Sequence, residues 1–262
     1  LLSRGRLMLK QLRTVVLFGV PFVVGVLNLR HPVLRPPIYS GIVSHLSWWI
    51  TLHVLNLILF PLLGLAAYLL VKDVSNIAAS VSRIALGIFV PIYAAFDALA
   101  GIGTGVLVVN AQRLMPHEAN SFEPLIDAYW NSSIINALAA IGSIAWVIAM
   151  LAAAVAWTDA DHRRLAGLVA VILFVVDGWA QTNLFLPSFG MTIPVTWWLI
   201  VAIMGLSMFV VAKPRTSATL LVLSGVFFGA SHVSPTGPLG MLCFIGAVIY
   251  IQVRRRQLLP NT

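Results

Sequence analysis

Two aspartates stand inside long apolar stretches of the sequence, where a charged side chain is costly. Asp97 lies in the middle of the stretch 84–109, and Asp177 lies in the stretch 166–186 with Gln181 one helical turn further on. A carboxyl group at membrane depth usually takes up a proton, pairs with a cation or faces a water-filled path. We therefore expect these side chains to line a pathway for a small solute or ion. The alternative is structural, because a protonated carboxyl can also hold two helices together through a hydrogen bond.

Three histidines form a second group of candidate residues. His45 precedes the stretch 46–71, His53 lies about two turns inside it with Asn56 three residues on, and His232 falls near the end of a later stretch. All three are expected in the outer half of the membrane, where the histidines could line an outer vestibule and His53 and Asn56 could belong to the pathway for a solute or ion. The same three histidines could instead ligate zinc or copper, or two of them could hold a haem. The competing interpretation is that each is an ordinary interfacial histidine whose polar tip reaches water. The sequence itself requires no cofactor.

These side chains need elements that cross a membrane. The chain is 60% apolar and 9% charged, whereas soluble domains are roughly 45–50% apolar and 25% charged. Helices are the form in which such apolar runs satisfy their backbone hydrogen bonds in lipid, and about 20 residues suffice to cross. The sequence predicts an all-α integral membrane protein, a bundle of about eight transmembrane helices, at 14–29, 46–71, 84–109, 133–157, 166–186, 195–212, 217–233 and 239–253.

The distribution of positive charge predicts the orientation of this bundle. Of the 16 Lys and Arg residues, 13 fall on one side of the eight stretches and only Arg30, Arg35 and Arg113 on the other. Basic residues favour the cytoplasmic side, so both termini are predicted to be cytoplasmic, in the plasma (inner) membrane. Because the basic residues are spread over several short segments with no soluble domain to present them, the +8 net charge does not indicate a nucleic-acid partner.

The whole chain, residues 1–262, is predicted to form a single polytopic domain. A Trp-Trp pair opens each of the stretches 46–71 and 195–212, which raises the possibility of a weak four-plus-four repeat of 1–132 and 133–262. The longest loop, 110–132, is expected outside as a solvated connector, and the alternative is a short interfacial helix at 123–131. The lone cysteine, Cys243, excludes an internal disulfide.

The sequence favours a transporter or channel for a small solute or ion, with proton coupling as one form of it, since two carboxyl groups stand near mid-membrane. One alternative is a membrane-embedded enzyme or redox protein that uses the outer histidines for a metal or haem. Another is a non-catalytic membrane partner protein. No family signature is recognised, and the expected partners are the lipid bilayer and a small solute or ion.

Overall fold

The computed structural model describes residues 2–113, 116–188 and 193–258, and every regular element within these ranges is a helix. Six helical segments are long and apolar enough to cross a membrane: Met8–Asn28, Leu46–Val71, Ile77–Gln112, Phe122–Ala156, Ala160–Phe185 and Thr236–Gln257. Two further apolar helices, Val195–Val211 and Arg215–Ala230, have only 17 and 16 residues. The all-helical membrane architecture is confirmed, while the number of eight crossings stays a prediction.

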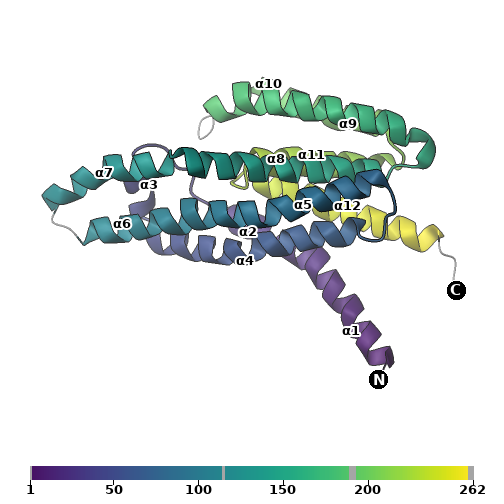
Figure 1. Cartoon of the computed structure of the whole chain (residues 1–262), viewed down its shortest axis with the longest axis horizontal. Coiled ribbons are helices and arrows are strands. Elements are labelled where there is room, and N and C mark those ends of the chain that lie inside the picture. The colour runs from purple at the N-terminus through teal and green to yellow at the C-terminus, as the bar shows by residue number, and fades with distance from the viewer. Residues whose placement is uncertain (1, 114–115, 189–192, 259–262) are drawn as a thin grey trace.

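The first half of the chain supplies two long rods and the segments that lead into them (Figure 1). Helix α1 points away from the bundle and continues through one π-helical turn into the bundle. The next rod is α4, and the rod after it contains a second π-helical segment. In chain order these elements are α1 (Leu2–Thr14), η1 (Val15–Gly19), α2 (Val20–Asn28), α3 (Ile38–Val43), α4 (Leu46–Val71), α5 (Ile77–Phe96), η2 (Asp97–Gly103) and α6 (Thr104–Gln112).

The second half supplies the centre of the bundle and an outer layer. Helix α8 lies among α5 and α11, whereas α9 and α10 form a layer on one side of the bundle (Figure 1). The elements are α7 (Pro116–Trp130), α8 (Ser133–Ala156), α9 (Ala160–Ala180), η3 (Gln181–Phe185), η4 (Leu186–Ser188), α10 (Val195–Val211), α11 (Arg215–Ala230) and α12 (Thr236–Leu258).

Close packing of α5 against α8 fixes the centre of the molecule. The Ser82 hydroxyl donates to the carbonyl of Ala149 at 2.9 Å, which ties the two helices together. Gly142 of α8 faces the ring of Tyr93, and a Cβ there would lie 2.6 Å from Cδ2 of the ring. Small residues thus let the two helices approach, as close helix contact in a membrane requires.

The segment 110–132 is more ordered than the sequence predicts. Instead of a short helix at 123–131, the structure has the 15-residue α7, which packs with α3 and α6 around a small apolar core that contains Ile42 and Ile126. Asp127 accepts a hydrogen bond at 2.8 Å from the backbone N–H of Ile38, at the start of α3. These helices extend one end of the bundle (Figure 1), so the chain there is not simply a connector.

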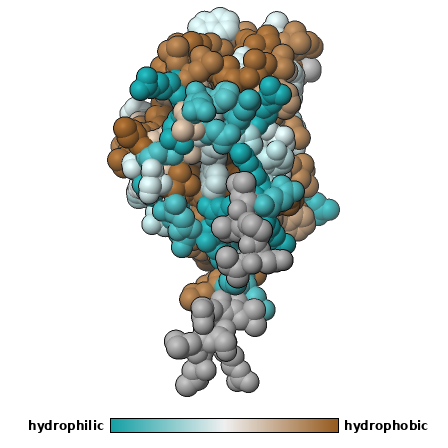
Figure 2. Space-filling model, turned by 90° about the vertical axis from the view of Figure 1, so that its right-hand side faces the viewer, coloured by the Kyte–Doolittle hydropathy of each residue, from teal (hydrophilic) through white to brown (hydrophobic). Residues whose placement is uncertain are grey.

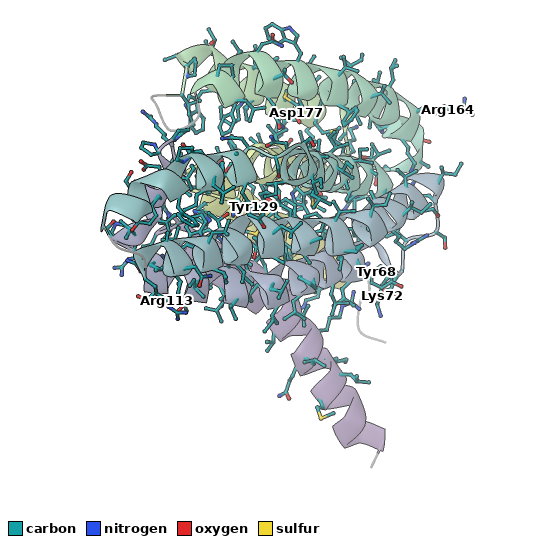
Figure 3. All side chains as sticks on the ribbon, turned by 60° about the vertical axis from the view of Figure 1, so that its left-hand side comes forward. Tyr68, Lys72, Arg113, Tyr129, Arg164 and Asp177 are labelled. Atoms are coloured by element: carbon teal, nitrogen blue, oxygen red, sulfur yellow. The ribbon has the colours of Figure 1, made fainter. Side chains whose placement is uncertain are left out.

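The two ends of the bundle carry different side chains. Lys72 and Arg164 lie toward one end and Arg113 lies at the opposite end (Figure 3). Seen along the long axis from the first of these ends, hydrophilic residues gather over the middle, and hydrophobic residues cover the top and parts of both flanks (Figure 2). This end, called the basic end below, corresponds to the side that charge predicts to be cytoplasmic. The flanks are apolar, with side chains such as Val171 and Leu206 more than 60% exposed, as lipid contact requires.

Candidate functional site

Three histidine rings meet in the interior of the bundle, on the side away from the basic end. His31 follows α2, His53 belongs to α4, and His232 follows α11. The centroid of the His31 ring lies 5.1 Å from that of His53 and 4.9 Å from that of His232, edge to face in both cases. The three residues are only 3–7% exposed. The structure therefore brings together imidazoles from distant parts of the chain.

The second π-helical segment positions His53. Trp49 donates a hydrogen bond from Nε1 to the carbonyl of Gly101 at 2.7 Å, and the ring of Trp49 lies against that of His53 with centroids 4.2 Å apart. A Cβ on Gly101 would overlap the His53 ring, so only glycine leaves room for the imidazole at this place. Single π-helical turns within α-helices often occur at functional sites, and here the turn begins at Asp97.

Hydrogen bonds to Nδ1 determine how the rings present their other nitrogen. His31 Nδ1 lies 2.8 Å from the carbonyl of Pro32, and His53 Nδ1 lies 2.7 Å from the carbonyl of Trp49. Because a carbonyl only accepts, Nδ1 must donate in both rings, and a neutral ring then carries a lone pair on Nε2. His232 Nδ1 shares a hydrogen bond of 2.9 Å with the hydroxyl of Tyr93.

Asp97 joins this group from the junction of α5 and η2. Its side chain is 1% exposed, and its Oδ1 lies 4.0 Å from Nε2 of His53. Among the side chains that the structure describes, none is a hydrogen-bond partner for either Asp97 oxygen, for Nε2 of His31 or for Nε2 of His232. Buried polar atoms are nearly always paired. We call His31, His53, His232 and Asp97 the histidine–carboxylate cluster; it gathers acceptors that the described residues do not satisfy.

His31, which lies outside the spanning helices, is held neutral by its surroundings. Burial, together with the neighbouring His53, lowers the pKa of His31 to about 3 against the weaker opposing effect of the Pro32 carbonyl. At neutral pH the His31 ring is therefore neutral and has a lone pair with which to bind a cation other than the proton.

The donor set fits a transition-metal ion better than a haem. Imidazole nitrogens and a carboxylate oxygen are ligands of zinc, and ligating histidines usually donate their other N–H to a carbonyl, as His31 and His53 do here. Rings in edge-to-face contact about 5 Å apart leave no space for a porphyrin between them. In the described parts of the chain no group of three or more His, Cys, Asp or Glu residues already has a metal-holding arrangement.

The distance between two of the candidate ligands shows how far the cluster is from such an arrangement. Two ligands of one tetrahedral zinc ion lie roughly 3.3 Å apart, since each is about 2.0–2.2 Å from the metal. His53 Nε2 and Asp97 Oδ1 are 4.0 Å apart. Side-chain adjustments of less than about 1 Å would bring this pair to coordination distance.

The other candidate residues lie apart from the cluster or beside it. Asp177 is buried on α9, in the outer layer (Figure 3), accepts a hydrogen bond of 2.7 Å from Gln181 Nε2, and lines a cavity of ≈ 200 Å³. Asn56 is fully buried one turn from His53, and both of its amide atoms lack a hydrogen-bond partner among the described residues. His45 is exposed where α4 begins. The structure thus joins His53, His232 and Asp97 but not Asp177.

Sequence reasoning missed His31 and Tyr93. His31 stands beyond the end of the first apolar stretch, next to a basic residue, and looks like part of a solvated loop. One available signal was depth, because the end of the first stretch and the start of the second are expected at the same side of the membrane. Tyr93 carried no signal of its own, since a single tyrosine in an apolar helix is common.

Fold and site together define a polytopic helical membrane protein with a buried histidine–carboxylate cluster. Comparison with known proteins found no match, neither to a protein-family model nor to a curated protein or a solved structure. The function must therefore be inferred from the geometry of the cluster.

Proposed function

We propose that this polytopic membrane protein is a metal-dependent enzyme whose divalent ion binds to the histidine–carboxylate cluster. The observation that carries the proposal is the convergence of three imidazoles and one carboxylate, all at most 7% exposed, with acceptor atoms that no donor among the described residues satisfies. A buried set of acceptors of this kind is costly unless a cation compensates it. Zinc is the best fit, because it takes nitrogen and oxygen ligands and needs only four of them.

The residues around the cluster have distinct roles in this proposal. The carbonyls of Pro32 and Trp49 orient His31 and His53, and the Tyr93 hydroxyl orients His232. Outer hydrogen bonds of this type set the direction and the basicity of the ligating nitrogen. A bound divalent ion would supply Lewis-acid chemistry for the hydrolysis of a carbonyl or phosphoryl bond. Asp97 is the one acid of the cluster, and it serves either as fourth ligand or as the group that accepts a proton from water.

Transport of a small solute or ion is the second candidate function. It is supported by Asp177, a second buried carboxyl group, which lines a cavity of ≈ 200 Å³ with Ser143 and Gln181. We rank it second because Asp97 lies with the histidines rather than with Asp177. Both candidates share the same proposed setting: eight crossings, cytoplasmic termini at the basic end, and the cluster in the opposite half of a plasma membrane.

Metal analysis of the purified protein tests the proposal. We expect about one zinc ion per chain after mild purification, because the four ligands form one site, and a loss of metal from His31→Ala, His232→Ala and Asp97→Asn. Asp97→Asn preserves the size of the side chain and removes its charge, so it should fold. The matched control is His45→Gln, which changes an exposed histidine outside the cluster and should retain the metal.

Two outcomes would contradict the proposal in different ways. A well-folded wild-type protein that neither retains nor takes up zinc, copper, manganese or iron would exclude the metal site. Metal-loaded protein that carries protons or metal ions across vesicle membranes, but hydrolyses no ester, amide or phosphoester substrate, would favour transport over catalysis. Asp177→Asn separates the two functions further, since only transport through both carboxyl groups requires Asp177.

A further inference from the structure

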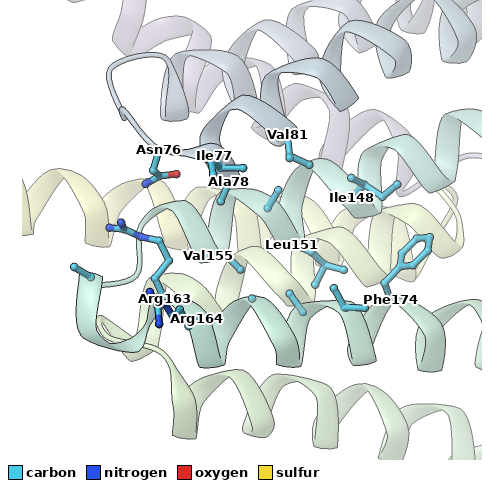
Figure 4. A pocket seen from close by; sticks show the side chains of 15 residues that line it. Asn76, Ile77, Ala78, Val81, Ile148, Leu151, Val155, Arg163, Arg164 and Phe174 are labelled. Atoms are coloured by element: carbon cyan, nitrogen blue, oxygen red, sulfur yellow. The ribbon is translucent and has the colours of Figure 1, made fainter.

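A large apolar groove lies between α5, α8 and α9 and is separate from the histidine–carboxylate cluster (Figure 4). Its volume is ≈ 830 Å³, within the range of about 300–1,000 Å³ that is usual for small-molecule sites. Most of its lining is aliphatic or aromatic, with Val81, Leu151 and Phe174 among the larger side chains. Arg163 and Arg164 lie at one end of the groove and Phe174 at the other (Figure 4).

The basic end of this groove opens beside a second, polar pocket. The polar pocket has a volume of ≈ 560 Å³ and is lined by Arg163, Arg254 and Arg255. Arg163 and Asn76 line both cavities, so the two adjoin at these residues. An apolar groove thus continues into a cationic pocket. This arrangement is complementary to an amphiphile that has an apolar tail and an anionic head group.

The carboxylates that line the polar pocket are already engaged. Asp159 accepts from Arg254 at 3.2 Å, and Asp73 lies 3.4 Å from Arg13 and 3.9 Å from Lys72. Of the three arginines that line the pocket, only Arg254 takes part in these ion pairs, and Arg163 and Arg255 do not. The positive charge that remains available belongs to those two.

Arg163 and Arg255 supply that available charge. The guanidinium of Arg163 donates from Nη2 to the carbonyl of Thr158 at 3.1 Å, while its Nε is buried without a hydrogen-bond partner among the described residues. The guanidinium of Arg255 lies over the ring of Trp157, 4.5 Å from the centroid. A phosphate group would provide the oxygen acceptors that guanidinium groups bind best.

The groove also has the depth of one membrane leaflet. On α9 its lining runs from Ala160 to Phe174. The part between the proposed phosphate ligand Arg163 and Phe174 spans roughly 16 Å at about 1.5 Å per residue, about half of the ~30 Å thickness of the hydrocarbon core. Arg163 lies in the first turns of α9, where the helix dipole adds to the attraction for an anion. One acyl chain matches the length of the groove, and its phosphate at the membrane surface matches the position of Arg163.

We propose that an anionic phospholipid of the leaflet at the basic end binds here, with an acyl chain in the groove between α8 and α9 and its phosphate at Arg163 and Arg255. Charge complementarity selects this occupant over a neutral lipid, because the two arginines of the head pocket form no ion pair with a carboxylate of the described residues. The proposed head-group ligands are the two arginines rather than Asn76, because the Asn76 amide already donates one N–H to the carbonyl of Ala156 and its oxygen already accepts from the backbone N–H of Ala79 in the first turn of α5.

Lipid binding can be measured on the purified protein in a neutral detergent. Phosphatidylglycerol, phosphatidylcholine and inorganic phosphate are added separately, and bound lipid is counted by native mass spectrometry while thermal unfolding is recorded. We expect phosphatidylglycerol to bind and to raise the unfolding midpoint, phosphatidylcholine to bind about tenfold more weakly or worse, and inorganic phosphate alone to have no effect. Loss of a charged hydrogen bond in Arg163→Gln should weaken phosphatidylglycerol binding about tenfold or more.

Two matched pairs of variants make the result specific. Gly167 lines the groove, and a Cβ added there would meet only Val155, at 4.0 Å, so Gly167→Leu should fill the groove and displace the acyl chain. Gly87→Leu, at a helical glycine with open space around it, is the control. Arg113→Gln, at the opposite end of the bundle, is the control for Arg163→Gln.

Three results would overturn the lipid site. Equal binding of the neutral and the anionic lipid would contradict selection of an anionic head group by this pocket. Stabilisation by phosphate alone would show that the pocket binds a simple anion and not a lipid. Unchanged phosphatidylglycerol binding in both Gly167→Leu and Arg163→Gln would remove the site altogether. If Arg163→Gln does not fold, Arg163→Lys keeps the charge without the fork of donors and should weaken binding by a smaller factor; binding equal to that of the wild type would then contradict the site.

Discussion

Gly101→Ala is the sharpest test of the histidine–carboxylate cluster, because the added methyl group enters the space of one ring. The new Cβ would overlap Cγ and Cδ2 of His53 and would lie 2.7 Å from its Cβ. The ring has little freedom to move away, since Trp49 packs against it and the Trp49 carbonyl holds its Nδ1 at 2.7 Å. We therefore expect the variant to displace the imidazole from the cluster.

The size of the effect follows from opposing contributions. Alanine favours a helix over glycine by about 1 kcal/mol. Against this, overpacking in a well-packed interior costs about 1–3 kcal/mol, and a lost hydrogen bond of His53 costs about 0.5–1.5 kcal/mol. The expected net destabilisation is about 0.5–3.5 kcal/mol. Zinc affinity should fall at least tenfold, because one ligand no longer points at the site.

The assay combines unfolding with metal content. Both are measured for Gly101→Ala and for Gly87→Ala, whose Cβ meets nothing within 4 Å and which should be as stable as the wild type or slightly more so. If Gly101→Ala unfolds like the control and retains its full zinc content, the assignment of His53 to a tightly packed metal site is wrong. A destabilised variant that still binds zinc at full affinity would leave the packing correct and refute the role of His53 as a ligand.

Three further predictions concern the outer hydrogen bonds, the metal itself and the topology. Tyr93→Phe removes the 2.9 Å hydrogen bond to His232 and should weaken zinc binding about 10–100-fold at a cost of about 1 kcal/mol in stability, measured by competition with a chelator; unchanged affinity would show that the hydroxyl does not orient the ligand. Removing zinc with a chelator should lower the unfolding midpoint, and zinc added back at about 100 times its Kd should restore about 2.7 kcal/mol of unfolding free energy. An unfolding midpoint that does not change with zinc would contradict the site. In a Cys243→Ser background, an impermeant thiol reagent should label Gln112→Cys from outside but not Thr216→Cys, both exposed positions; outside labelling of Thr216→Cys would refute eight crossings.

Some residues of the histidine–carboxylate cluster can be predicted from the sequence and others cannot. Depth along the membrane was enough to place His53 and His232 in the same half of the bundle, and an aspartate in an apolar run was enough to single out Asp97. Their contact with His31 could not be read from the sequence, because His31 is separated by 201 positions from His232. That contact depends on α2 packing against both α4 and α12.

Asp97 and Asp177 look equivalent in the sequence, but the structure separates them. Both residues stand near the middle of apolar runs, so the sequence makes them equivalent partners of one pathway. In the structure Asp97 belongs to the histidine–carboxylate cluster, whereas Asp177 lies on α9 in the outer layer and pairs with Gln181. Depth in the membrane is a property of each helix alone, but neighbourhood depends on the order of helices around the bundle.

The sequence by itself determines the class of this protein and the position of several helices. The predicted stretch 46–71 has the same bounds as α4, and 133–157 differs from α8 by one residue. This works because transfer into lipid is a local property, in which each long apolar run must satisfy its own backbone hydrogen bonds. The tertiary structure alone decides which faces of these helices meet. Their rotation is set by close packing, as where Gly101 admits His53 and Gly142 admits Tyr93, and such contacts depend on both partners at once.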